Sequence, residues 1–127
     1  YQDDLERFRQ CGASIVFFDT LNDSHLPKID GLFLGGGFPE TQMDRLEANI
    51  TLRTDIRNQI HQGLPTYAEC GGLMYLSESI EWQGNRAEMV GTIPARAKMH
   101  DRPVGRGYTR LRPMAAMPWP QLGVDVA

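Results

Sequence analysis

The sequence has few cysteines, no long apolar run and no signal-like start, and each shortage excludes a class of protein. Two cysteines among 127 residues, Cys11 and Cys70, are too few for a disulfide framework and suit a reducing cytosol, so we expect a cytoplasmic protein. The longest apolar runs, such as residues 15–18, are far too short to cross a bilayer, and no basic stretch followed by an apolar one opens the chain. We therefore expect no membrane partner.

Positive charge is also scarce. Thirteen Lys and Arg against sixteen Asp and Glu give a net charge of -3, and with a pI near 5.5 we expect no nucleic-acid partner. The histidines and cysteines show no zinc-ligand spacing, so we expect no metal site. The composition, 41% hydrophobic and 23% charged, is that of an ordinary globular protein. The length of 127 residues suits one domain or part of one.

Both ends of the sequence look cut. The first residue, Tyr1, is not Met and leads straight into a helical pattern, and residues 118–127 stop without a helix end or a closing charged tail. We expect a piece of a longer polypeptide, truncated at both ends.

Apolar runs and helical patterns alternate along the chain through residue 79. The expected elements are a helix over 3–11, a strand over 13–18, a loop over 19–29, a strand over 31–34, a helical stretch over 43–60 with a break near 49–51, a strand over 65–68 and a helix through 73–76. A hairpin-like turn at 82–86 and strands at 90–93 and 108–111 follow. This order predicts an α/β fold, an open and mostly parallel sheet with helices on both faces.

The segment around Cys70 is the most informative, because Cys70 stands between a predicted strand and a predicted helix and is followed by Gly71 and Gly72. A nucleophile at a sharp strand-to-helix turn is held out from the sheet, and small neighbours allow the turn and the approach of substrate. The Gly71 amide would point at an oxyanion on a carbonyl that Cys70 attacks. The alternative is that Cys70 is a small buried hydrophobe, as free cysteines often are. Cys11 lies late in an amphipathic helix without such a turn, and we interpret it as structural. For Glu69 there are two interpretations: it helps to position the turn, or it is a carboxylate at the end of the strand without a role in the site.

A second glycine-rich turn, residues 35–40, follows the strand predicted at 31–34. It fits neither the dinucleotide fingerprint nor the phosphate loop, because Glu40 replaces the third glycine and no Gly-Lys-Ser/Thr follows. Both turns follow strands, so they should lie at one edge of a parallel sheet. There the amides of Gly36 and Gly37, with that of Gly71, would bind an oxyanion or glutamine; the alternative is a tight turn without a ligand.

A cysteine nucleophile usually needs a histidine as its base. His25 lies in a polar loop and His61 near a helix end, and we interpret both as solvated surface residues. His100 lies in a loop that would overhang the crevice, and we do not assign it as the base. The sequence therefore predicts a catalytic Cys70 without an identifiable catalytic histidine.

Two segments carry a resemblance to a known family. Residues 35–40, followed about thirty residues later by residues 68–76, resemble the glutamine amidotransferase domain of the cobyrinic acid a,c-diamide synthases. Residues 1–6, 99–103 and 107–108 resemble it too, so the similarity extends to about residue 111.

This resemblance implies a class I glutamine amidotransferase-like fold and a ligase of cobalamin biosynthesis. In that family Cys70 would attack the carboxamide of glutamine, ammonia would leave, and water would hydrolyse the glutamyl thioester. A separate N-terminal domain would use ATP and magnesium to activate the a and c carboxylates of the corrin, which ammonia converts to amides. The implied partners are glutamine and, through that synthetase domain, the corrin; a homodimer is left open.

The sequence departs from the family in three places. It has no phosphate loop, so we interpret residues 1–127 as a partial glutaminase domain without cofactors of its own and without the ATP-binding synthetase domain. The family's first strand is expected before Tyr1, and nothing after residue 111 matches its histidine-rich motif. The piece alone can therefore be inactive.

Alternatives stay open at this point. A binding or interaction module would keep the fold and lack the base, and a cysteine hydrolase would act on another substrate. The tetrapyrrole also stays open, since a nickel-containing precursor would serve as well as a cobalt corrin.

Overall fold

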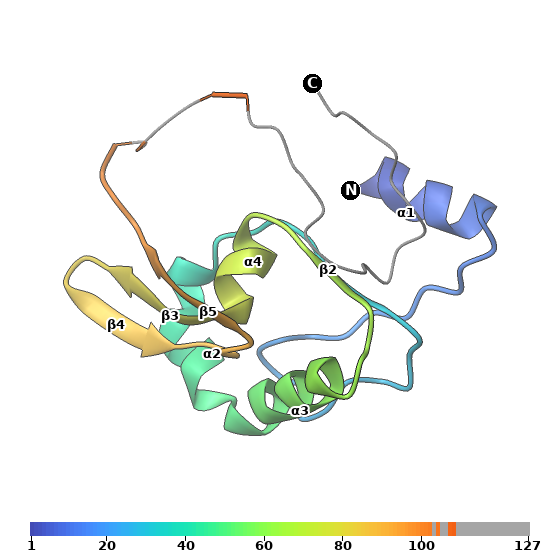
Figure 1. Ribbon diagram of the computed structural model, residues 1–127, viewed down its shortest axis with the longest axis horizontal. Coiled ribbons are helices and arrows are strands. Elements are labelled where there is room, and N and C mark those ends of the chain that lie inside the picture. The colour runs from blue at the N-terminus through green and yellow to red at the C-terminus, as the bar shows by residue number, and fades with distance from the viewer. Residues whose placement is uncertain (103, 105–106, 109–127) are drawn as a thin grey trace.

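Two small sheets and a set of short helices make up the part of the chain that the computed structural model describes, residues 1–102, 104 and 107–108 (Figure 1). The elements in chain order are helix α1 (Gln2–Gln10), strand β1 (Leu32–Leu34), 3-10 helix η1 (Pro39–Gln42), helices α2 (Met43–Ala48) and α3 (Ile50–His61), strand β2 (Thr66–Ala68), helix α4 (Gly71–Leu76) and strands β3 (Ser77–Trp82), β4 (Asn85–Glu88) and β5 (Ile93–Lys98).

Strand pairing is mostly parallel. β1 pairs with β2 in parallel, with Leu32 opposite Thr66 and Leu34 opposite Ala68. The second sheet has the order β4-β3-β5, in which β3 runs antiparallel to β4 and parallel to β5. The predicted α/β class with mostly parallel pairing is confirmed, and the described strands form two sheets.

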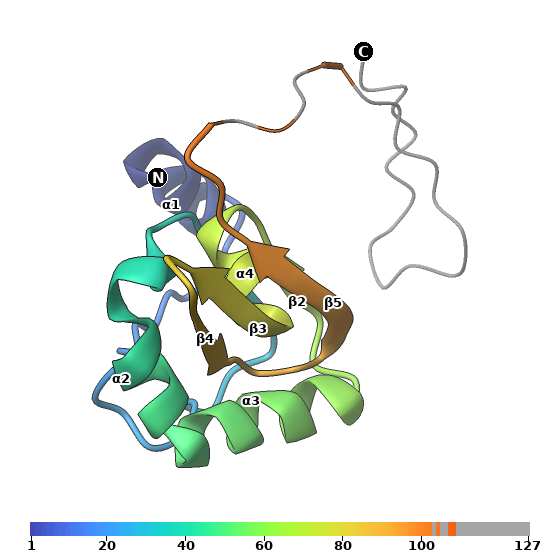
Figure 2. The same cartoon turned by 90° about the vertical axis from the view of Figure 1, so that its left-hand side faces the viewer.

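The core lies between the second sheet and the helices that pack on it (Figure 2). Leu52 and Ile56, four residues apart on one face of α3, are fully buried, and Ile80 of β3 is buried with them. α2 contributes Met43 and Leu46 to the same cluster. One continuous apolar cluster therefore joins the helical stretch to the sheet.

The break between α2 and α3 falls at Asn49, as predicted. Its side-chain oxygen accepts a hydrogen bond from the Leu52 amide at 3.4 Å, which caps α3. Its side-chain amide donates to the carbonyls of Thr20 and Asp23 at 3.0 and 2.8 Å. Gly63, with a φ of 101°, follows the end of α3 in the left-handed conformation that glycine adopts without a steric penalty.

Residues 13–18 do not form the buried strand that their composition predicts. Val16 is 53% exposed and Phe17 is 70% exposed, and no strand of the described structure pairs with this segment. A β-branched apolar run becomes a strand only where a neighbour accepts its backbone hydrogen bonds. That prediction is therefore wrong for the described structure.

The strand predicted at 90–93 is also misplaced, because β5 begins only at Ile93. Residues before it bond to the end of α4: the amides of Val90 and Thr92 donate to the carbonyls of Tyr75 and Leu76 at 3.0 Å each. Two arginine side chains of α3 donate hydrogen bonds to the same connection. Arg53 donates to the carbonyl oxygen of Met89 at 2.8 Å, and Arg57 donates to that of Val90 at 2.5 Å.

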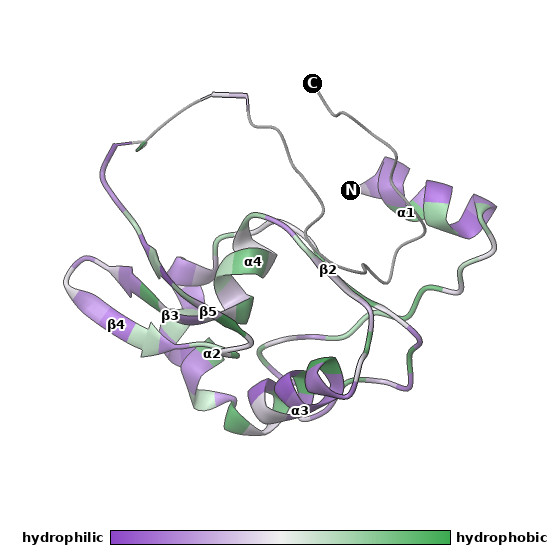
Figure 3. Ribbon diagram, in the orientation of Figure 1, coloured by the Kyte–Doolittle hydropathy of each residue, from purple (hydrophilic) through white to green (hydrophobic). Residues whose placement is uncertain are grey.

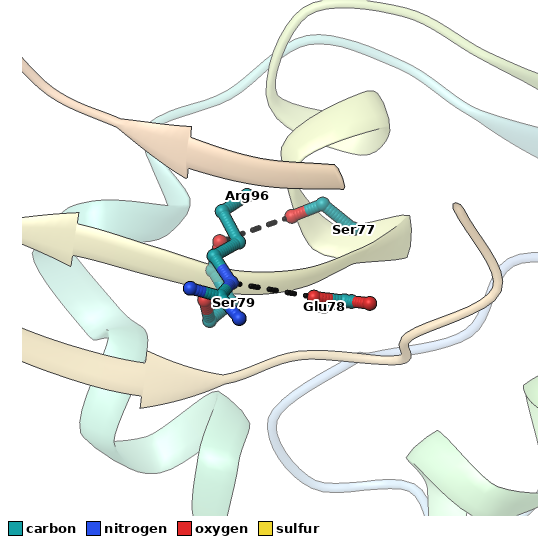
Figure 4. Close-up of polar contacts among 4 residues, drawn as sticks. All are labelled: Ser77, Glu78, Ser79 and Arg96. Atoms are coloured by element: carbon teal, nitrogen blue, oxygen red, sulfur yellow. Dashed lines mark hydrogen bonds and ion pairs between the residues drawn. The ribbon is translucent and has the colours of Figure 1, made fainter. Parts of the chain in front are cut away.

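β5 continues to Lys98, beyond the end of the strand predicted at residues 90–93. Ser77 and Ser79 of β3 stand opposite Ile93 and Arg96, so β5 has one extra residue there, a bulge. Pro94 lies in this bulge, where its missing N–H interrupts no regular ladder. Figure 4 shows the neighbouring contacts, in which Ser77 donates to the Ser79 carbonyl at 3.2 Å and Arg96 pairs with Glu78 at 3.4 Å.

The predicted hairpin turn between residues 82 and 86 is confirmed. Gln83 and Gly84 both have positive φ, 50° and 79°, as the tight turn between β3 and β4 requires. Of the strand predicted at 108–111, only residue 108 belongs to the described residues. Among the helices in those residues, none has the length and apolar character needed to cross a membrane.

α1 differs from the other helices because none of its residues is buried. Most of its ribbon has the hydrophilic colour in Figure 3. Its attachment comes from aromatic side chains: Phe8 packs edge-on against Phe33 of β1 with centroids 5.5 Å apart, and Tyr1 does so at 6.0 Å. Phe33 in turn stacks on Tyr67 of β2 at 5.4 Å.

Candidate active site

Cys70 lies at the sharp turn between β2 and α4. Its backbone has φ 47° and ψ -115°, a conformation that a residue with a Cβ atom adopts only under strain. Gln83 is the other non-glycine residue of the described chain with a positive φ, and it belongs to the hairpin turn. Such a strained strand-to-helix turn is the geometry that presents a nucleophile above a sheet. The thiol is free and exposed, as is that of Cys11.

Gly71 and Gly72 allow the two glycine-rich turns to touch through their main chains. A Cβ atom on Gly71 would lie 2.6 Å from the carbonyl oxygen of Gly37, and one on Gly72 would overlap the carbonyl oxygen of Leu34. The Gly72 amide donates to the Gly35 carbonyl at 3.0 Å. The carboxyl ends of the paired strands β1 and β2 thus bring residues 35–37 against the Cys70 turn.

The three glycine amides that the sequence singles out differ in what they bond. The Gly36 amide donates to the hydroxyl oxygen of Tyr1 at 2.6 Å. The amides of Gly37 and Gly71 donate to no group within the described residues. A Cβ atom on Gly36 would lie 3.6 Å from that of Cys70, which places the glycine turn directly beside the thiol-bearing residue.

Glu69 is held by two tyrosines, neither of which was predicted as a site residue. Tyr1 donates to one carboxylate oxygen at 2.5 Å, and Tyr67 donates to the other at 2.9 Å. These hydrogen bonds hold the pKa of Glu69 below its ordinary value, and they raise the pKa of Tyr67 and of Tyr1. The period of two along β2 places Tyr67 and Glu69 on the same face, a signal present in the sequence. No comparable pattern in the sequence indicates that Tyr1 lies beside Glu69.

The three histidines belong to other segments than this turn. His25 is paired with Ser24 at 3.0 Å between Nδ1 and Oγ, His61 ends α3, and His100 follows β5. Within the described residues, no hydrogen bond joins a histidine to Cys70. In the same part of the chain, no group of three His, Cys, Asp or Glu residues has the arrangement to hold a metal ion.

The geometry combines a strained cysteine turn with unbonded glycine amides, and the comparison with known families agrees with that combination. The pattern of the CobB/CobQ-like glutamine amidotransferase domain matches residues 1–120. The chain belongs to this family. The match contains β1, the glycine turn, Cys70 and α4.

Three relatives of this chain carry the same name. A protein of Magnetococcus marinus named cobyrinate a,c-diamide synthase is 43% identical over 126 residues, 99% of this chain and 27% of that relative. Proteins of the same name from Archaeoglobus fulgidus and Synechocystis are 46% and 40% identical and are matched by 88% and 94% of this chain. No solved structure matches the chain.

The chain spans only about a quarter of the length of these relatives, 27% of the first and 24% of the second. The predicted resemblance is confirmed at the level of the family and its glutamine amidotransferase domain.

Proposed function

We propose that this chain is the glutaminase part of an ATP-dependent, glutamine-hydrolysing amide ligase, a cobyrinate a,c-diamide synthase. The observation that carries the proposal is the strained Cys70 turn pressed against a glycine turn in a chain of this amidotransferase family. The names of the relatives support the substrate, because three proteins at 40% to 46% identity are called cobyrinate a,c-diamide synthase.

In the proposed reaction the Cys70 thiolate attacks the side-chain carbonyl carbon of glutamine. The negative charge that develops on the carbonyl oxygen is stabilised by the Gly37 and Gly71 amides, which bond to nothing else in the described residues. The C–N bond breaks as the nitrogen takes up a proton and leaves as ammonia, and water then hydrolyses the thioester to glutamate. Gly36 contributes by its lack of a side chain, because a Cβ atom there would lie 2.6 Å from the Tyr1 hydroxyl oxygen.

ATP and magnesium belong, in this proposal, to a synthetase domain outside these residues. The sequence has no phosphate loop, and its glycine turn is occupied by contacts with the Cys70 turn. There the a and c carboxylates of the tetrapyrrole are activated and receive the ammonia that Cys70 chemistry releases. The choice between a cobalt corrin and a nickel-containing precursor is made in that domain.

Substitution of the nucleophile in the natural protein tests this division of labour. Cys70→Ala should abolish amidation with glutamine and leave amidation with added ammonia intact, because only the first route needs the thiol. Cys11→Ala is the matched control, since Cys11 is equally free and exposed but lies at the end of α1. Glutamine use that survives Cys70→Ala contradicts the proposal.

A binding module that keeps the fold and lacks catalysis is the second candidate. It is favoured by the placement of the histidines, none of which bonds to Cys70 in the described residues. A glutamine analogue with a diazo-ketone in place of the carboxamide separates the two. Labelling of Cys70 that glutamine blocks supports the glutaminase, and a thiol inert to the analogue in the natural protein supports the binding module.

A further inference from the structure

A network of hydrogen bonds connects the residue before the nucleophile to the glycine turn. Glu69 accepts from Tyr1 and Tyr67, and the oxygen of Tyr1 accepts from the amide of Gly36. The network crosses from β2 to the turn after β1, and it includes the N-terminal end of α1. Three segments far apart in sequence are therefore joined in one network, in which Tyr1 links the Glu69 carboxylate to the Gly36 amide.

The direction of each hydrogen bond follows from the charge of Glu69. An ionised carboxylate only accepts, so both tyrosine hydroxyl protons point at it. The lone pairs of the Tyr1 oxygen are then left for the Gly36 N–H at 2.6 Å. The carboxylate thus sets the orientation of a hydroxyl that binds the main chain of the glycine turn.

We propose that Glu69 is a positioning residue for the glutaminase reaction, acting through Tyr1 on the turn formed by Gly36 and Gly37. This rests on the proposed function. Tyr1 holds the Gly36 amide, and the next amide, that of Gly37, lies where a Cβ atom on Gly71 would approach it to 2.8 Å. Holding one amide fixes its neighbour, so the two unbonded donors keep the spacing that an oxyanion requires.

The packing role of the two tyrosines can be tested separately from the positioning role of their hydroxyl groups, because the aromatic contacts do not involve the hydroxyls. Phe33 stacks on Tyr67 and meets Tyr1 edge-on, and these contacts involve only ring atoms. Glu69 is half-buried and makes no contribution to the apolar core. Removal of a hydroxyl or of the charge should therefore leave the fold intact and change only the turn.

The test measures glutamine hydrolysis by the natural protein carrying Glu69→Gln or Tyr67→Phe. The loss of one orienting hydrogen bond should lower kcat about tenfold with KM nearly unchanged, because the donors act on the transition state. Amidation with added ammonia should stay at its original rate. Glu88→Gln and Tyr108→Phe, at exposed positions, are the matched controls and should keep the original kcat.

Two kinetic results would overturn the proposal. A raised KM with unchanged kcat would make Glu69 a ligand of glutamine, and unchanged kinetics in both variants would leave it without a role. If the unsubstituted protein labels at Cys70 and hydrolyses glutamine, these results count against Glu69 alone. A protein that does neither contradicts the proposed function itself.

A spectroscopic measurement tests the network without activity. The pKa of Tyr67 is raised by its hydrogen bond to Glu69, so the ring-carbon NMR signal of Tyr67 should titrate at a lower pH in Glu69→Gln than in the unsubstituted protein. An unchanged Tyr67 titration would show that the network is not formed, and it would overturn the proposal whatever the enzyme does.

Discussion

The two sheets of this chain are held together in different ways. The β4-β3-β5 sheet is packed by buried side chains of α3 and α4, with Leu52, Ile56 and Ile80 fully buried. The β1–β2 sheet has strands of three residues each, and it supports the Cys70 turn through main-chain contacts at glycines. The large fully buried side chains lie in the first region and the candidate chemistry in the second.

A cavity in the packed region should give the largest loss of stability. Ile56→Ala removes a fully buried side chain from α3 and should lower the free energy of unfolding by about 2–5 kcal/mol. Ile50→Ala in the same helix is the control, because that side chain is 63% exposed and its loss should change stability by less than about 0.5 kcal/mol. Urea unfolding followed by circular dichroism measures both, and equal losses would contradict the division.

A smaller loss should follow when a methyl group is forced between the two turns. Gly72→Ala places a Cβ atom against the Leu34 main chain, and overpacking of this kind costs about 1–3 kcal/mol. Gly37→Ala is the matched variant for stability, because a Cβ atom there has no neighbour within 4 Å. Thermal unfolding that lowers the midpoint of both variants alike would show that the turns do not touch as described.

The smallest effect is expected at a buried hydroxyl of the packed region. Tyr75 is 3% exposed, and its hydroxyl has no hydrogen-bond partner in the described residues. Tyr75→Phe should therefore leave stability at neutral pH within about 0.5 kcal/mol or raise it, since no bond is lost.

The same hydroxyl predicts a dependence of stability on alkaline pH. Burial raises the pKa of Tyr75 from 10.0 to about 12, because it disfavours the charged phenolate. The contribution of the neutral form is fully present below the unfolded pKa and is lost as the pH rises through the folded one. The unsubstituted protein should lose more stability than Tyr75→Phe over that interval in urea titrations, and parallel curves would contradict the burial.

The sequence predicted correctly those features of the fold that depend on residues close together along the chain. The Cys70 turn follows from the glycine pair between two patterns, and the break at Asn49 follows from an interrupted helical register. Residues 13–18 were mispredicted, because a strand also needs a partner that composition does not reveal. The connection before Ile93 failed similarly, since its carbonyls bond to arginines of α3 more than thirty residues earlier.

The candidate site shows the same limit. Cys70, Gly37 and Gly71 could be proposed from the residue types alone, whereas the bond between Tyr1 and Glu69 joins residues 68 positions apart. The Gly36 amide was predicted as one of three equivalent donors, and only the folded chain distinguishes it by its bond to Tyr1. Which amides are unbonded is a property of tertiary contacts.

The contact between Gly71 and Gly37 has a consequence for motion. Where two helices or strands meet through side chains, rotamer changes absorb small displacements. Here main chain meets main chain, and neither glycine has a side-chain torsion that could absorb a displacement. The Cys70 turn and the Gly37 amide should therefore move together in thermal fluctuations. The distance between them should vary less than the position of either one.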